Sequence, residues 1–506
     1  MDDYKAFKEA SVSGLTGSTV THVNLISSVA LVSIALYSTL QTRVYGARTI
    51  PFLVSFILLP LPLLLSMTIF ANTAAILALL LLVPTAYLYA RYPPLDVVIP
   101  LPSARPSSTQ PPSSGMALVP AITTYRSHMM LMTVLGILAV DFPVFPRALA
   151  KCESYGVSLM DLGVGSFVFS NGVVSAIPLL KDSRHLSAPI LPKLGDVLRR
   201  TIPIIALGLI RVLLVKGTEY PEHETEYGTH WNFFLTLALL PIFQVLLHPL
   251  IRTVPASMLG LGVGAFQQIA LSLLGLKRYV QTAPRVDLIS ANKEGIASLI
   301  GYLSIHLLGL AMGTLVLPPS PSFFRRLRSG RAVPGDLGMP RQNDKTAIEL
   351  ASYAIVWWVL LGLSSVLGVD EGVSRQTANL PYALWIAAFN TSFILGYLTL
   401  DMVFFPGLPH KKPKPSSTAP ASGYSTPGAA PPPAGPPPAR APLLLEAINK
   451  NALPLFLLAN LGTGLVNLSM RTMYAGTVMA MGVLSLYTLV ICGVAWGFRR
   501  TRVWRL

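Results

Sequence analysis

Apolar segments long enough to cross a lipid bilayer recur along almost the whole 506-residue sequence. A transmembrane helix needs about 17–25 apolar residues, and about thirteen runs meet that length. They lie near 21–41, 49–69, 71–91, 122–141, 156–179, 200–215, 231–250, 256–276, 295–317, 346–368, 379–403, 450–470 and 474–498. Since a lipid-exposed backbone must satisfy its own hydrogen bonds, such runs form helices. The sequence predicts an all-α, polytopic integral membrane protein with about thirteen transmembrane helices.

The composition agrees with a bilayer environment. Only 12% of the residues are charged and 52% are hydrophobic, whereas a soluble protein carries roughly a quarter charged residues. The formal net charge of +16 is typical of cytoplasmic loops that face anionic lipid. No zinc-finger or RNA-binding pattern is present, so we expect membrane lipid and no nucleic acid as partner. With only Cys152 and Cys492, a disulfide framework and a cysteine-rich metal site are excluded.

Three polar stretches read as loops within a single transmembrane domain that covers residues 1–506. Residues 92–120 are rich in Pro and Ser, residues 318–345 hold an arginine cluster, and residues 405–442 are a Pro-rich segment that we expect to be disordered. With thirteen spans, these loops and the basic C-terminal tail share one side, which the positive-inside rule makes cytoplasmic. The N-terminus and the loops 142–155, 216–230, 277–294 and 369–378 then face the opposite side.

The opposite-side loops mix carboxylates, cations and amides. If the topology is right they converge at one membrane surface, where such a mixture suits a substrate with phosphate groups and a hydroxyl to deprotonate. Asp141 ends an apolar run, and Pro143 and Pro146 turn the chain so that Lys151 can reach it. Burial would raise the pKa of Asp141 and the lysine would lower it, which can poise a general base. The alternative is a salt bridge that only fixes a loop.

Two polar residues follow in the next span. Asp161 lies among glycines that permit close helix approach, so helix packing competes with a catalytic role. Asn171, in a Ser-Asn-Gly sequence, indicates either a helix break beside a cavity or a helix end.

The later loops supply three further candidates. His230 begins a span beside Trp231, where an interfacial anchor and a substrate contact are both open. Asn292 and Lys293 stand at a predicted helix start, where Lys293 either meets an anionic ligand or is part of ordinary capping. The four glutamates between 219 and 226 look like a solvated face.

The blocks DFPVFPRALAKCESYGVSLMDLGVGSFVFSNG, EYGTHWNFFLTLALLP, LISANKEGIASLIGYLSIHLLG and ALPLFLLANLGTGLVNLSM together resemble the GPI-anchored wall transfer proteins. These are the inositol acyltransferases of glycosylphosphatidylinositol (GPI) anchor synthesis. The resemblance runs from one end of the chain to the other, leaves out the Pro-rich loops, and implies a fungal enzyme of the endoplasmic reticulum. Its N-terminus would then be lumenal and its C-terminus cytoplasmic.

The resemblance implies transfer of a fatty acyl group, typically palmitoyl, from acyl-CoA to the inositol 2-hydroxyl of glucosaminyl-phosphatidylinositol. The family's favoured catalytic pair falls on Asp141 and Lys151. We expect Asp141 to act as general base and Lys151 to tune it or to stabilise the oxyanion. Arg147 and Lys293 would meet phosphate, with Asp161, Asn171, His230 and Asn292 as further pocket residues. Acyl-CoA is the co-substrate, and neither a bound cofactor nor a metal is required. A multi-pass transporter and a non-catalytic scaffold are the rival functions.

Overall fold

The computed structural model describes residues 2–95, 116, 119–182, 184–216, 224–406 and 439–504. Within these ranges every regular element is helical, apart from an isolated bridge between Gly17, Ser18 and Val157. The all-α prediction is therefore confirmed. Residues 407–438, most of the segment 405–442 that we expect to be disordered, and most of the predicted loop 92–120 lie outside the described residues.

Eight helices among the described residues are long and apolar enough to cross a membrane. They are α2 with the following turn (Val20–Tyr45), η2 with α5 (Ala71–Arg91), α7 (Leu159–Lys181), α15 (Lys293–Val316), α17 (Asn343–Val366), α18 (Leu380–Phe404), α20 (Ala452–Ser469) and α21 (Thr477–Gly497). A ninth results if α12 (Ala256–Ser272) and α13 (Leu276–Thr282), bent by 61°, form one span. A multi-spanning architecture is confirmed, but the count of thirteen is not.

The other predicted spans form helices of a different kind. The run near 49–69 is divided into α3 (Phe52–Leu58) and α4 (Pro60–Met67), because Pro60 cannot continue a helix. The run near 231–250 gives α10 (Phe233–Leu246) and α11 (His248–Thr253). Helix α6 (Pro120–Ala139) is mostly buried, and α8 (Ile190–Lys216) is long but less apolar. The remaining short helices are α1 (Asp2–Val12), α9 (Glu224–Tyr227), α14 (Leu288–Ala291), α16 (Phe323–Arg328) and α19 (Leu443–Lys450).

Helices α7 and α15 pack with their backbones in contact at the centre of the protein. A Cβ atom added at Gly172 would lie 2.1 Å from the carbonyl oxygen of His306, and one at Gly309 would lie 2.1 Å from that of Phe169. Only glycine fits such an approach. Helix α7 runs unbroken through Asn171, so the predicted helix break there is wrong: the neighbouring glycine serves helix packing.

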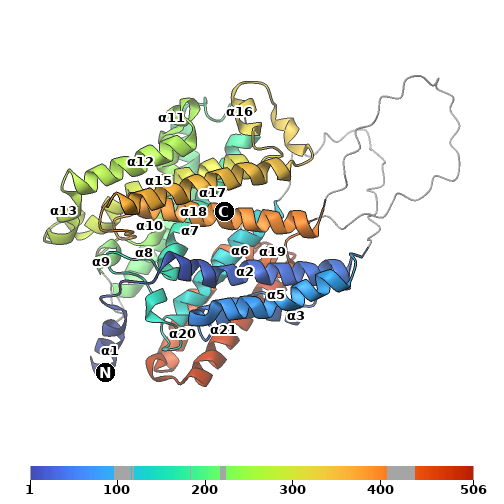
Figure 1. Cartoon of the computed structure of the whole chain (residues 1–506). Helices are drawn as coiled ribbons and strands as arrows, with labels where there is room; N and C mark the ends of the chain where they lie inside the picture. Colours follow the sequence, from blue (N-terminus) through green and yellow to red (C-terminus); the bar gives the residue numbers. More distant parts are fainter. Residues whose placement is uncertain are drawn as a thin grey trace.

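The loops that we assigned to one membrane side do converge at one end of the bundle, where α9 and α13 lie (Figure 1). The Oγ of Ser374 donates to the carbonyl of Ser154 at 2.6 Å, and Lys277 forms an ion pair with Asp370 at 2.9 Å. The backbone N–H of Gly14 donates to Glu153 at 2.7 Å, which joins the N-terminal segment to the same end. Segment 318–345 is not simply a loop, because it contains α16 and the start of α17.

Candidate functional site

Asp141 directly follows α6 and its carboxylate is enclosed by residues distant in sequence. One oxygen, Oδ1, lies 2.8 Å from Nζ of Lys8 in α1. The other, Oδ2, accepts a hydrogen bond of 2.7 Å from Nδ2 of Asn467 in α20. The residue is only 5% exposed. Asp141 is thus a buried carboxylate held by one cation and one amide. A buried charge needs such partners, because burying it without them is strongly unfavourable.

Arg147 lies in the turn after Asp141 and closes the C-terminal end of α6. Its guanidinium donates to the carbonyl oxygens of Val140 at 2.7 Å and Phe142 at 3.3 Å. Burial lowers the pKa of Arg147, and the nearby charge of Asp141 partly opposes this decrease. These hydrogen bonds give partners to backbone carbonyls at the C-terminal end of α6, which have none within the helix.

Lys151 belongs to a second group of charges, which runs inward from the loops to α7. Its Nζ lies 2.7 Å from Oε1 of Glu226 and 2.9 Å from Oε2. Glu226 Oε1 is 3.4 Å from Nη1 of Arg375, whose Nε is 2.6 Å from Oδ1 of Asp161. The result is a continuous chain of alternating charges, Lys151–Glu226–Arg375–Asp161, which we call the buried charge chain.

The inner half of the buried charge chain is almost completely enclosed. The side chains of Arg375 and Asp161 are 3% and 1% exposed. Asp161 also accepts hydrogen bonds from Oγ of Ser158 at 2.8 Å and from the backbone N–H of Cys152 at 3.0 Å. Burial opposes ionisation of Glu226, but Lys151 and Arg375 outweigh it and lower the pKa of Glu226 to about 2. Asp161 therefore fixes the 150s loop onto α7 and does not simply fill space between helices.

The structure does not bring Asp141 and Lys151 together, contrary to the pairing expected from their spacing. Each binds a different partner, Lys8 or Glu226, supplied by a remote part of the chain. The view of the glutamates as a solvated face is wrong at Glu226, which is largely buried against two cations. Sequence reasoning missed Lys8, Asn467 and Arg375. The one available signal for Arg375 was that it is the single basic residue in the loop 369–378.

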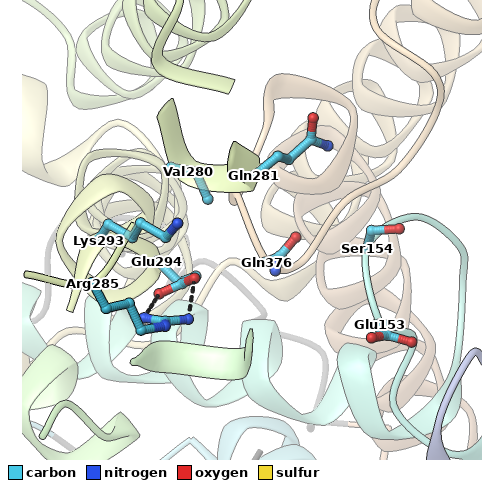
Figure 2. Close-up of a pocket in the computed structure, with 8 residues that line it drawn as sticks. All are labelled: Glu153, Ser154, Val280, Gln281, Arg285, Lys293, Glu294 and Gln376. Atoms are coloured by element: carbon cyan, nitrogen blue, oxygen red, sulfur yellow. Dashed lines mark hydrogen bonds and ion pairs between the residues drawn. The ribbon is translucent and has the colours of Figure 1, made fainter. Parts of the chain in front are cut away.

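A polar pocket of about 370 Å³ opens among these loops. It is lined by Glu153, Ser154, Val280, Gln281, Arg285, Lys293, Glu294 and Gln376. Figure 2 shows Arg285, Lys293 and Glu294 on one side and Glu153 and Ser154 on the other. Two lining residues, Glu153 and Gln376, follow closely after Lys151 and Arg375 in sequence. The pocket is therefore adjacent to the buried charge chain.

Lys293 and Glu294, at the start of α15, have different roles in this pocket. Glu294 forms a bidentate ion pair with Arg285, at 2.6 and 3.0 Å, and is itself buried. Lys293 is 6% exposed, and its Nζ donates to the carbonyl of Ala283. Among the described residues no carboxylate forms an ion pair with Lys293, so its ammonium can also bind an anionic ligand group.

The other predicted site residues are placed differently. Asn292 accepts a hydrogen bond of 2.8 Å from the backbone N–H of His230, and thereby ties the segment before α10 to α15. Asn171 lies about 15 Å further along α7 than Asp161, from the rise of 1.5 Å per residue. It therefore does not belong to the loop end of the bundle. Among the described residues, no group of three His, Cys, Asp or Glu side chains could hold a metal ion.

A bundle of apolar helices whose loops build a charged pocket at one end defines a multi-pass helical membrane protein with a polar site. The chain belongs to the GWT1 family, whose model matches residues 4–498. Similar proteins named GPI-anchored wall transfer protein 1 occur in *Aspergillus fumigatus* and *Gibberella zeae*. The first is 40% identical, with 97% of each chain covered, and the second is 40% identical, with 97% of this chain and 96% of the relative covered. A *Cryptococcus neoformans* relative of the same name is 44% identical over 76% of this chain and 63% of its own.

Proposed function

We propose that this protein acts in GPI-anchor biosynthesis as an inositol acyltransferase. It transfers a fatty acyl group, palmitoyl in the simplest case, from acyl-CoA to the inositol 2-hydroxyl of glucosaminyl-phosphatidylinositol. Membership of the GWT1 family over nearly the whole chain supports the pathway. The observation that carries the reaction type is the enclosed carboxylate of Asp141 at the loop end of the bundle, where a hydroxyl can be deprotonated away from bulk water.

The proposed reaction is a direct acyl transfer. Asp141 takes the proton of the inositol hydroxyl while the hydroxyl oxygen bonds to the thioester carbonyl carbon. The resulting oxyanion collapses, the carbon–sulfur bond breaks, and the CoA thiolate leaves and takes up a proton. The ester and free CoA are the products, so atoms and charge balance without a bound cofactor or a metal.

The two cations near the loop end have separate roles in this scheme. Lys8 holds the carboxylate of Asp141 in place through Oδ1, as Asn467 does through Oδ2. Lys151 stabilises the oxyanion. It suits this role because its side chain is 39% exposed, while Glu226 fixes its position. Tuning of Asp141 by direct contact with Lys151 is not part of the proposal.

The polar pocket suits the headgroup of the acceptor. Lys293 would bind phosphate, and Ser154 and Gln376 line the pocket as hydrogen-bonding groups for sugar hydroxyls. Asn292 and His230 would shape the pocket through their mutual hydrogen bond. Arg147 would bind a phosphate group of the substrate near Asp141. We place the protein in the endoplasmic reticulum membrane, with this end and the N-terminus lumenal and the C-terminus cytoplasmic.

An acyl-transfer assay tests the reaction class directly. Purified protein in detergent is incubated with radiolabelled palmitoyl-CoA and glucosaminyl-phosphatidylinositol, and the lipids are separated by chromatography. Label in an inositol-acylated product supports the proposal. Since no membrane has to be crossed in detergent, the same product excludes a pure transporter or scaffold. The absence of labelled product with folded protein would contradict the proposed reaction.

A further inference from the structure

A second pocket lies at the opposite end of the bundle from the polar site. Its volume is about 390 Å³, and it is lined by Thr49, Ile50, Pro51, Leu443, Trp496, Arg499 and Arg500. These residues come from the segment after α2, from the start of α19 and from the end of α21. Helix α2 begins beside the contact of Ser18 with Val157, near the polar site, and residues 49–51 of the second pocket follow the other end of this helix.

One wall of this second pocket is apolar. Ile50 is fully buried at its base, and Pro51, Leu443 and Trp496 extend the wall. The guanidinium of Arg499 lies over the indole of Trp496, with its central carbon 5.0 Å from the ring centroid. Such a surface accepts a hydrocarbon chain next to a charged group, as aromatic and basic residues do at a membrane interface.

The rim of the second pocket is cationic. Arg499 donates from Nη1 to the carbonyl of Trp496 at 2.8 Å, which holds its guanidinium at the rim. Lys450 donates to the carbonyls of Arg499 and Arg500, at 3.4 and 2.9 Å, and adds a third positive charge. The part of the chain that the structure describes gives none of these three cations a carboxylate partner, and the guanidinium of Arg500 has no hydrogen bond there.

Three neighbouring cations without a counter-charge favour an anion with several acceptor oxygens, because arginine binds phosphate in bidentate fashion. The apolar wall requires that this anion carry a hydrocarbon chain. We propose that the second pocket binds a phosphate-bearing amphiphile, with phosphate between Arg499 and Arg500 and hydrocarbon along Trp496 and Leu443. Two sources share this chemistry: an anionic phospholipid of the surrounding membrane, and an acyl-CoA.

Native mass spectrometry of the purified full chain in detergent tests the site. The protein is titrated with dioctanoyl phosphatidic acid, with the zwitterionic, net-neutral dioctanoyl phosphatidylcholine as the comparison, and separately with palmitoyl-CoA. The variant Arg500→Gln removes a guanidinium that makes no hydrogen bond within the described residues, so it should fold normally. Arg499→Gln/Arg500→Gln removes both charges, and Arg278→Gln/Arg331→Gln removes two exposed charges elsewhere.

We expect at least one of the two anionic ligands to bind the parent about tenfold or more tightly than it binds either pocket variant. The Arg278→Gln/Arg331→Gln control should bind like the parent. If the pocket variants weaken the binding of phosphatidic acid, the ligand is the phospholipid. If they weaken the binding of palmitoyl-CoA, the ligand is the acyl-CoA. Equal binding by parent and pocket variants, equal loss in the control, or no binding of either anion by the parent would overturn the assignment.

Discussion

The ammonium group of Lys8 lies 2.8 Å from the carboxylate of Asp141 and also donates a hydrogen bond of 3.0 Å to Asn467. Asn467 in turn donates to the other oxygen of the same carboxylate. The N-terminal helix α1 therefore completes the surroundings of the proposed base. It is held there by further contacts, including stacking of Phe7 on Tyr474 with ring centroids 5.8 Å apart.

Replacing Lys8 should impair both the reaction and the fold. In Lys8→Met the buried Asp141 carboxylate loses its only ion pair among the described residues and keeps Asn467 as its hydrogen-bond partner, so it is held less firmly in position. We expect acyl transfer to fall by at least about tenfold, since hydrogen bonds to charged groups are worth about 1.5–3 kcal/mol. Lys8→Arg should restore much of the rate, and Lys345→Met, at an exposed site, should match the parent. Parent-like activity in Lys8→Met would show that this contact is dispensable.

Arg375 should be among the most destabilising positions to change. Arg375→Met leaves Asp161 buried without a cation, and breaking one partner of a buried pair costs about 3–5 kcal/mol. We expect a clear drop in apparent melting temperature in detergent. The double variant Asp161→Asn/Arg375→Met should recover part of this loss, because it no longer buries an unpaired carboxylate. The exposed Arg331→Met serves as control. An Arg375→Met protein that melts with the parent would refute the structural role of the buried charge chain.

The stability contributed by Glu226 should depend on pH in a defined direction. Its pKa falls from an ordinary 4.5 to about 2 in the folded protein, so the unfolded chain binds this proton more readily. The contribution is therefore complete above pH 4.5 and is lost as the pH falls toward 2. The melting-temperature difference between the parent and Glu226→Gln should shrink over this range. A difference that stays constant, or grows on acidification, would contradict the lowered pKa.

Hydrophobic run length was enough to predict an all-helical, multi-pass protein, and charge bias was enough to predict which loops meet. Run length could not predict whether an apolar run forms one straight helix, two short helices or a bent pair of helices. Pro60 divides one run into two short helices, and the run near 256–276 ends at a sharp bend before α13. Run length measures total apolar content, whereas bends and breaks depend on individual prolines and on packing against neighbouring helices.

The candidate site shows the same limit more strongly. Asp141 and Lys151 were identified from one block of sequence, but the side chains that bind them are Lys8, Asn467 and Glu226. Spacing within a block contains no information on partners contributed by remote helices. Lys293 was predicted as an anion contact and does line the polar pocket, because its position at the start of α15 is a local feature that sequence can reveal.

The acyl-transfer rate of Asp141→Asn tests the central claim most directly. The amide keeps the shape of the side chain and its capacity to accept a hydrogen bond from Asn467, but it cannot take a proton from the inositol hydroxyl. We predict a rate at least about 100-fold below the parent, the loss typical of a removed general base. The exposed Asp196→Asn, with the same change of charge, should retain the parent rate. Inositol acylation by folded Asp141→Asn at a near-parental rate would contradict the assignment of Asp141 as the base.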